Sequence, residues 1–178
     1  MKLGIYVGSF NPPHEGHHQV INYLLDNKYV DKVLLLPTPG YWDKNNLVSI
    51  EDRINMLKYY EDNNVIVDST HNNYPYTYQV LRSIKNDYDD ELYLIIGSDN
   101  LEKLHEWKNI DEILENNKII VLKREDYNKN IYLDKYEDRF IYVDDFKPIK
   151  VSSTEIREGN SNFINPNILK YIEEHNLY

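Results

Sequence analysis

Apolar runs of strand length alternate with segments of helical period along the whole chain, and this order restricts the fold more than any other feature. Runs rich in Val, Ile, Leu and Tyr predict strands at residues 2–8, 32–37, 64–68, 91–97, 118–123 and 139–144. Apolar residues at helical spacing predict helices within residues 16–28, 49–61, 77–86, 99–107, 110–115, 152–157 and 165–175. Such alternation predicts an α/β fold with a doubly wound, mostly parallel sheet that helices cover on both faces.

The length and charge of the chain limit its organisation and its partners. Its 178 residues predict a single domain over residues 1–178, to which the C-terminal helical residues 152–178 belong. A formal net charge of −10 argues against nucleic acid as a partner, because a nucleic-acid binder needs a basic face. The chain has no cysteine, which excludes disulfides, thiolate metal sites and cysteine nucleophiles. Without a signal-peptide pattern or an apolar run of membrane-spanning length, we expect a cytoplasmic protein that binds no membrane, with a homo-oligomer left open.

Chemically unusual residues gather directly after the predicted strands, at 8–18, 37–44, 97–107 and 151–157. In open parallel sheets, ligands bind at the carboxyl ends of the strands, where the topology changes direction. The four segments are therefore expected to form one binding site.

The stretch "GSFNPPHEGHHQV" (8–20) holds three of the six histidines, directly after the first predicted strand. Gly16 allows close approach of the backbone where the helix starts, and His14 and His17 can point the same way because they lie three residues apart. A helix N-terminus flanked by imidazoles favours a phosphate-binding site. His18 points elsewhere and is interpreted as structural. Zinc is the competing ligand for His-x-x-His, but no third ligand has an obvious relation to this pair.

Two motifs carry a family resemblance. "GSFNPPHEGH" resembles the strand-1 signature of the nucleotidyltransferase superfamily, and "VSSTEIR" (151–157) resembles its C-terminal motif. The segments "LYLIIGSDNLEKLHEWKNIDEIL" (92–114), "YPYTYQVLRSI" (74–84) and "NPNILKYIEEHNLY" (165–178) are similar to the nicotinate (nicotinamide) mononucleotide adenylyltransferases, so the resemblance covers nearly the whole chain. Three departures stand out: Gln79-Val80 replace an Asp-Thr pair, Tyr41-Trp42-Asp43-Lys44 replaces a Pro-His-Lys arrangement, and the segment between Arg157 and Asn165 is short.

The resemblance implies a Rossmann-like nucleotidyltransferase fold, and adenylyl transfer from ATP to nicotinate mononucleotide or also to nicotinamide mononucleotide. The products would be deamido-NAD or NAD and pyrophosphate, in NAD biosynthesis, with Mg²⁺ bound mainly through the ATP phosphates. The implied catalytic residues are His14, His17, Lys44 and Arg157. The implied ATP-binding residues are Gly8, Ser9, Phe10, His14, His17, Gly97, Asp99, Ser152, Ser153, Thr154 and Arg157. The implied mononucleotide-binding residues are Asn11, Lys44, Thr77 and Trp107, and no residue is implied as a dedicated metal ligand.

Other interpretations stay open beside this one. The pantetheine-phosphate adenylyltransferases usually carry threonine as the first member of their x-x-G-H motif, so His14 and Trp107 argue against them. A nucleotide-binding sensor without turnover would be free to lose the phosphate-transfer residues that are present here. Ordinary helix caps or core positions are the structural alternatives for Ser152, Asp99, Thr77 and Trp107. For Arg53, the expectation is a charge on the surface of a helix. The highly charged residues 124–138 are expected to form an excursion at the surface.

Overall fold

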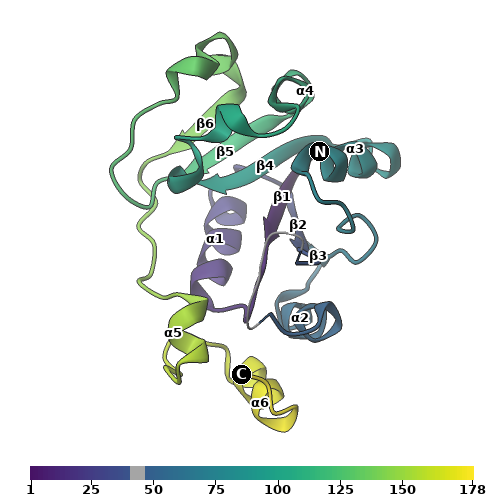
Figure 1. Cartoon of the computed structure of the whole chain (residues 1–178), viewed down its shortest axis with the longest axis vertical. Coiled ribbons are helices and arrows are strands. Elements are labelled where there is room, and N and C mark those ends of the chain that lie inside the picture. Colours follow the sequence, from purple (N-terminus) through teal and green to yellow (C-terminus); the bar gives the residue numbers. More distant parts are fainter. Residues whose placement is uncertain (41–46) are drawn as a thin grey trace.

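The fold is built on a parallel sheet of six strands in the order β3-β2-β1-β4-β5-β6. The computed structural model describes residues 1–40 and 47–178. The strands are β1 (Lys2–Gly8), β2 (Lys32–Pro37), β3 (Val65–Val67), β4 (Glu91–Gly97), β5 (Lys118–Leu122) and β6 (Phe140–Val143). This arrangement, visible in Figure 1, confirms the expected doubly wound α/β fold.

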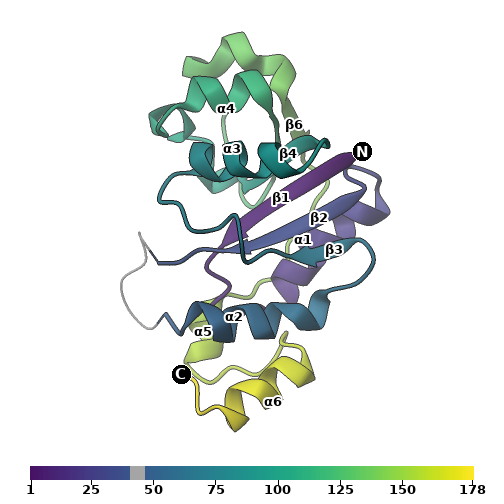
Figure 2. The same ribbon diagram turned by 90° about the vertical axis from the view of Figure 1, so that its right-hand side faces the viewer.

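Helices cover both faces of the sheet, as the alternation of elements predicts. They are α1 (Glu15–Asp26), α2 (Ile50–Leu57), α3 (Thr77–Asp87), α4 (Ile110–Asn116), α5 (Ser153–Arg157) and α6 (Pro166–Glu174). Helices α1 and α2 share one core with one face of the sheet, while α3 and α4 share a second core with the other face. Figure 2 shows α3 and α4 on the opposite side of the strands from α2, with α5 and α6 below the sheet.

Side chains alternate between the two cores along each strand, as the two-residue period of a strand requires. In β2, Val33 and Leu35 enter the α1-side core, and Leu34 and Leu36 enter the α3-side core. The C-terminal region joins the α1-side core through Ile156, Ile164 and Ile168. Among residues 1–40 and 47–178, no helix is long and apolar enough to cross a membrane.

Three predicted helix starts have the expected N-caps. Ser49 Oγ accepts a hydrogen bond from Asp52 N at 3.1 Å, and Asn165 Oδ1 accepts one from Asn167 N at 2.8 Å. Ser152 Oγ accepts one from Glu155 N at 3.2 Å, so Ser152 is the helix cap expected as the alternative to a purely ligand-binding role. Local sequence signals therefore set where these helices begin.

Two segments differ from the sequence prediction. Residues 99–107 form no continuous helix but two 3-10 turns, Ser98–Asn100 and Leu104–Glu106, although Leu101 and Leu104 are both buried in the α3-side core. Residues 124–138 do not all lie on the surface. A 3-10 segment, Ile131–Arg139, buries Leu133, and Asn130 Nδ2 donates to Leu101 O at 2.9 Å.

Candidate functional site

The carboxyl ends of β1 and β4 meet where the sheet order changes direction, and a cleft of about 940 Å³ opens beside them. This is the place where doubly wound sheets bind ligands. The cleft is lined by residues from four separate segments, among them Tyr6, His14, Gly16, His17, Arg124, Ser152 and Ser153. Segments 8–18 and 151–157 therefore come together as the sequence predicts.

His14 and His17 form a stacked pair at the start of α1. Their ring centroids lie 3.8 Å apart with an angle of 21° between the planes. His14 Nδ1 accepts a hydrogen bond from Gly16 N at 3.0 Å, and His17 Nδ1 accepts one from His14 N at 3.0 Å. Because each Nδ1 is an acceptor, the proton of each neutral ring lies on Nε2, which is left as a hydrogen-bond donor.

The histidine pair is supported by small and aromatic neighbours. A Cβ on residue 16 would lie 2.8 Å from His14 Cε1, so only glycine lets the imidazole close over the first turn. Phe10 is 2% exposed and packs edge-on against His17, with centroids 4.9 Å apart. Its side chain thus supports the His17 ring and has little surface left for contact with a ligand.

Burial keeps both imidazoles neutral. Desolvation, with a smaller contribution from the Arg124 charge, lowers the pKa of His14 to about 4. Desolvation, His14 and Arg124 together hold the pKa of His17 well below its ordinary value. Near pH 7 the pair therefore offers two uncharged N–H donors to a ligand in the cleft.

The segment "SSTEIR" is tied to the loop that follows β1. Ser153 Oγ donates to Pro12 O at 2.8 Å, and Arg157 Nη1 donates to Asn11 O at 2.7 Å. Arg157 Nη2 also donates to Thr154 Oγ1 at 3.1 Å. Ser152 and Ser153 line the main cleft, whereas Thr154 and Arg157 line a second cavity of about 530 Å³.

Gly97 is the last residue of β4 and Asp99 follows the strand, but Asp99 caps no helix. It lies inside the 3-10 turn Ser98–Asn100, and its Oδ1 is 3.7 Å from Arg124 Nε. A Cβ on residue 97 would lie 2.6 Å from the same Nε, so Gly97 makes room for this pair. The interpretation of Asp99 as an N-cap is therefore wrong.

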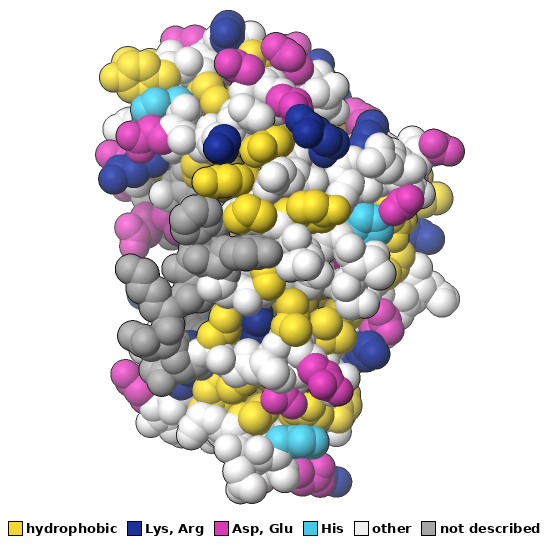
Figure 3. All heavy atoms as spheres, turned by 45° about the vertical axis from the view of Figure 1, so that its right-hand side comes forward, with side chains coloured by type: hydrophobic (Ala, Val, Ile, Leu, Met, Phe, Trp, Pro, Cys, Tyr) yellow, Lys and Arg dark blue, Asp and Glu magenta, His cyan; other side chains and the backbone are white. Residues whose placement is uncertain are grey.

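Two smaller cavities lie on the other side of β1. One, of about 240 Å³, is lined by Gly8, Ser9 and Thr77 among others, and the next, of about 350 Å³, is lined by Thr77, Trp107 and Lys108 with their neighbours. Thr77 belongs to both, and it is the first residue of α3, after the N-cap Tyr76. Figure 3 shows hydrophobic side chains gathered across the middle of the face on this α2 and α3 side.

Asn11 and Lys44 complete the predicted mononucleotide set. Asn11 is buried, and its Oδ1 accepts hydrogen bonds from Val48 N at 3.2 Å and from the Tyr178 hydroxyl at 2.5 Å. Its side chain therefore joins the loop after β1 to two later segments. Lys44 lies outside the described residues.

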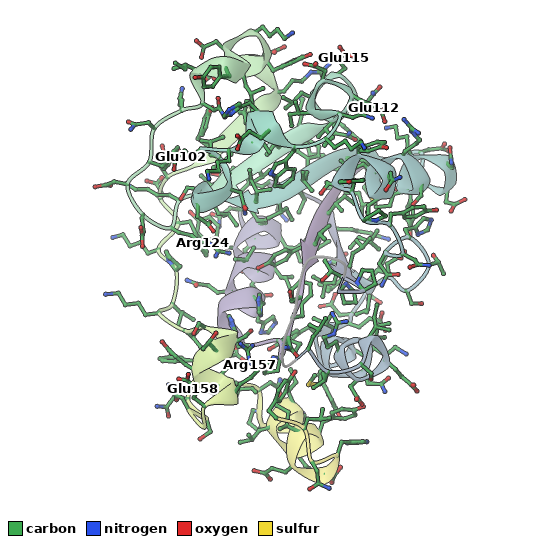
Figure 4. The ribbon with its side chains drawn as sticks, in the orientation of Figure 1. Glu102, Glu112, Glu115, Arg124, Arg157 and Glu158 are labelled. Carbon is green, nitrogen blue, oxygen red and sulfur yellow. The ribbon has the colours of Figure 1, made fainter. Side chains whose placement is uncertain are left out.

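The sequence patterns do not single out Arg124, and they misplace Arg53. Arg53 is 1% exposed and is not a helix-surface charge. Its Nε donates to Val48 O, and its Nη1 donates to Ser9 O and Thr38 O, at 2.6–3.0 Å. Arg124 lies two residues after β5, so the tendency of functional residues to follow strands could have found it. Figure 4 shows Arg124 above the cleft-side end of α1 and Arg157 on α5 below it.

The described residues hold no group of three or more His, Asp or Glu side chains placed to bind a metal ion. In the His-x-x-His pair, both Nδ1 atoms already accept backbone hydrogen bonds. His18 stacks on Tyr60 at 4.4 Å and does not line the cleft, as its structural interpretation predicts.

Comparisons with known proteins agree with this fold. A sequence model of the family described as cytidylyltransferase-like matches residues 5–159. A protein of Fusobacterium nucleatum named "probable nicotinate-nucleotide adenylyltransferase" is 35% identical, with 98% of each chain covered. A protein of Borrelia hermsii with the same name is 33% identical over 100% of this chain and 98% of its own. The fold is similar to that of a Plasmodium falciparum nicotinic acid mononucleotide adenylyltransferase complexed with NaAD, at a TM-score of 0.77 and 20% identity, covering 99% and 97% of the two chains. The chain therefore belongs to the cytidylyltransferase-like family and, within it, to the nicotinate-nucleotide adenylyltransferases.

Proposed function

We propose that this protein transfers the adenylyl group of ATP to the phosphate of nicotinate mononucleotide, releasing pyrophosphate and forming the dinucleotide deamido-NAD. The observation that carries the proposal is the stacked pair of neutral imidazoles, His14 and His17, at the cleft beside the sheet's change of direction. The names of the 30–35% identical relatives support the same reaction. The whole chain would act as one domain, in the cytoplasm.

The reaction needs no protein nucleophile. A phosphate oxygen of the mononucleotide attacks the α-phosphorus of ATP in line, the new P–O bond forms, and the bond to the β-phosphate oxygen breaks with its electron pair leaving on pyrophosphate. The protein positions the two reactants and stabilises charge on the phosphoryl oxygens. His14 and His17 would donate from Nε2 to these oxygens, and Ser152 and Ser153 would bind further phosphate oxygens from the start of α5.

The cavities beyond β1 are suited to the mononucleotide. Trp107 and Tyr76 give the larger one aromatic walls for a pyridine ring. Lys108 lines the same cavity, with its Nζ 4.7 Å from the centroid of Tyr76. An ammonium group favours a ring carboxylate over an amide, which supports nicotinate as the substrate.

Mg²⁺ would enter with the triphosphate. The lining of the cleft offers the carboxylates Glu125 and Asp144 but no cage of three ligands among the described residues, which fits an ion held mainly by phosphates and water. Bound there, the ion would neutralise phosphate charge, while the imidazoles and hydroxyls of the protein orient the α-phosphate.

The proposal is tested by measuring pyrophosphate release with nicotinate and nicotinamide mononucleotides in parallel, and by two variants that remove one imidazole and with it the Nε2 donor. In His14→Asn and His17→Asn, the amide oxygen can replace Nδ1 as the backbone acceptor, so the start of α1 is kept. Each should lower kcat by about 10²–10³, the cost of one lost transition-state donor. His18→Asn, on the same helix but outside the cleft, is the matched control. A folded wild-type protein that binds ATP but turns over neither mononucleotide would contradict the proposal.

A further inference from the structure

A buried histidine outside the cleft lies between two carboxylates. His71 is 8% exposed, and its ring lies between Asp68, directly after β3, and Asp87, the last residue of α3. Nδ1 lies 2.7 Å from Asp68 Oδ2, and Nε2 lies 2.5 Å from Asp87 Oδ2. Two carboxylate acceptors require two N–H donors, and only the protonated imidazole has both. With both contacts in place, His71 is therefore an imidazolium.

The titratable groups that face the ring favour its charge. Burial lowers the pKa of His71, but the hydrogen bonds and charges of Asp68 and Asp87 outweigh it, and the net shift is upward. Tyr88 meets the ring edge-on, with centroids 6.1 Å apart. Burial, with Asp90 among the neighbouring carboxylates, raises the pKa of Tyr88, so this hydroxyl stays uncharged where a histidine titrates. The change that rising pH brings to this cluster is therefore loss of the His71 proton.

The turn that begins at Asp68 is held on both sides of His71. Asp68 Oδ1 accepts hydrogen bonds from Thr70 N at 2.9 Å and from His71 N at 2.7 Å. The next residue, Asn72, is buried, and its Nδ2 donates to Pro37 O at the end of β2 at 2.9 Å. Asp68 is thus fixed by backbone bonds that do not depend on the charge of the ring.

The contact with Asp87 joins the start of a chain segment to its end. Residues 72–76 and the whole of α3 lie between His71 and this contact, and Figure 1 shows them as the loop and helix that follow β3. A neutral ring has one N–H and can keep one carboxylate as its acceptor. Asp68 is buried, whereas the Asp87 side chain is 63% exposed and water can solvate it. Deprotonation should therefore release Asp87.

The segment closed by this contact lines both cavities suited to the mononucleotide. Asn72, Tyr74 and Thr77 line the cavity of about 240 Å³. Tyr76 and Thr77 line the cavity of about 350 Å³. The cleft at the histidine pair is lined by other segments of the chain. A shift of residues 72–77 would thus alter the mononucleotide side of the site and leave the ATP side in place.

We propose that protonated His71, held between Asp68 and Asp87, is a positioning residue for the mononucleotide, and that the protein loses mononucleotide affinity when this ring loses its proton. His71 acts through residues 72–77 and does not contact the substrate. The inference deepens the proposed adenylyl transfer and rests on it for the identity of the ligand.

The test is the pH dependence of KM in wild type and in Asp87→Asn. In wild type, KM for nicotinate mononucleotide should rise at least about fivefold from about pH 7 to about pH 9, while KM for ATP stays within about twofold. Asp87→Asn removes one of the two charges that keep the ring protonated, so its rise should occur at lower pH. The variant should therefore bind the mononucleotide more weakly than wild type near neutral pH and equally weakly at high pH.

The sign of this result separates it from simple charge attraction. Removing a carboxylate makes the protein less negative, which by itself would favour an anionic substrate and lower KM. Asp89→Asn is the matched control, because it removes the same charge from an exposed side chain two residues further along the chain. Its pH profile should match that of wild type.

Three results would overturn the inference. The first is a wild-type KM for the mononucleotide that does not change over this pH range, and the second is an Asp87→Asn profile parallel to that of wild type. The third comes from hydrogen exchange at about pH 7.5, where amides within residues 72–77 should exchange faster in Asp87→Asn while those of α1 keep their rates. Equal rates in both proteins would contradict the positioning role. Hydrogen exchange needs neither substrate nor turnover, so it separates a failure of this inference from a failure of the proposed reaction.

Discussion

Replacing Gly16 with alanine adds one methyl group at the most crowded point of the histidine pair. The new Cβ would lie 2.8 Å from His14 Cε1, 2.9 Å from His14 Nδ1 and 3.0 Å from Val151 Cγ1. Ordinary contact would require the imidazole to retreat by roughly half an ångström, which would break its alignment with Gly16 N and its stack on His17. The substitution therefore moves a predicted phosphate donor without removing it.

The expected loss follows from that displacement. A misplacement of about 1 Å can cost 10²-fold in rate, so a shift of about half that size should lower kcat by roughly 10- to 100-fold. The stability should change little. Alanine gains up to about 1 kcal/mol of helix propensity over glycine, and a weakened N-cap loses about as much. Pyrophosphate release measures the first effect, and urea unfolding of the same sample measures the second.

Two outcomes would refute the reasoning. If Gly16→Ala turns over as fast as wild type, the position of His14 does not control the reaction. If it loses several kcal/mol of unfolding free energy, the glycine serves the fold and not the site, and the kinetic loss would say nothing about His14.

Two further predictions concern buried charges outside the cleft. Arg53→Met should lower the free energy of unfolding in urea by about 3 kcal/mol or more, because the carbonyls of Ser9, Thr38 and Val48 lose this donor. A change below about 1 kcal/mol would contradict this prediction. Burial lowers the pKa of His71, but hydrogen bonds to Asp68 and Asp87 outweigh it, and the net shift is upward. The stability that charged His71 contributes is complete below the ordinary histidine pKa and is lost as pH rises through the raised pKa of His71. His71→Gln should therefore destabilise the protein more at pH 6 than at pH 9, measured as the free energy of unfolding. An equal loss at both pH values would count against the pairing of His71 with Asp68 and Asp87.

The parts of the fold that local patterns control could be predicted from the sequence. Strand positions follow from short apolar runs, and the starts of α2, α5 and α6 follow from Ser49, Ser152 and Asn165. That His14 and His17 point the same way follows from their three-residue spacing, whereas the stacking of their rings is seen only in the structure. Each of these features depends on residues that are close together in the chain.

Contacts between distant segments could not be predicted in this way. Arg53 is buried because carbonyls after β1, after β2 and before α2 converge on it, and nothing near residue 53 indicates this. Asp99 lies near Arg124 because β4 and β5 are neighbours in the sheet. The order of elements suggests that these two strands pair, but it does not determine which residues lie opposite each other. At 99–107 the apolar spacing of Leu101 and Leu104 correctly indicates burial in the α3-side core, but the backbone there forms two 3-10 turns and no continuous helix.

The neutrality of the histidine pair bears on how the site could work in an acidic protein. A charged imidazolium would attract the phosphates of bound ATP as well as those of the transition state, and the part of this attraction that is equal in both states does not raise kcat. An uncharged N–H donor binds the ground state less tightly, and its hydrogen bond strengthens as charge moves onto the phosphoryl oxygens. On this argument, the burial that lowers the pKa of His14 and His17 favours the transition state over bound ATP. Attraction of the anionic substrate is left to the lysine and arginine side chains that line the cleft. On this argument Phe10, which touches His17 and is closed to solvent, is predicted to aid the reaction by keeping water away from an imidazole.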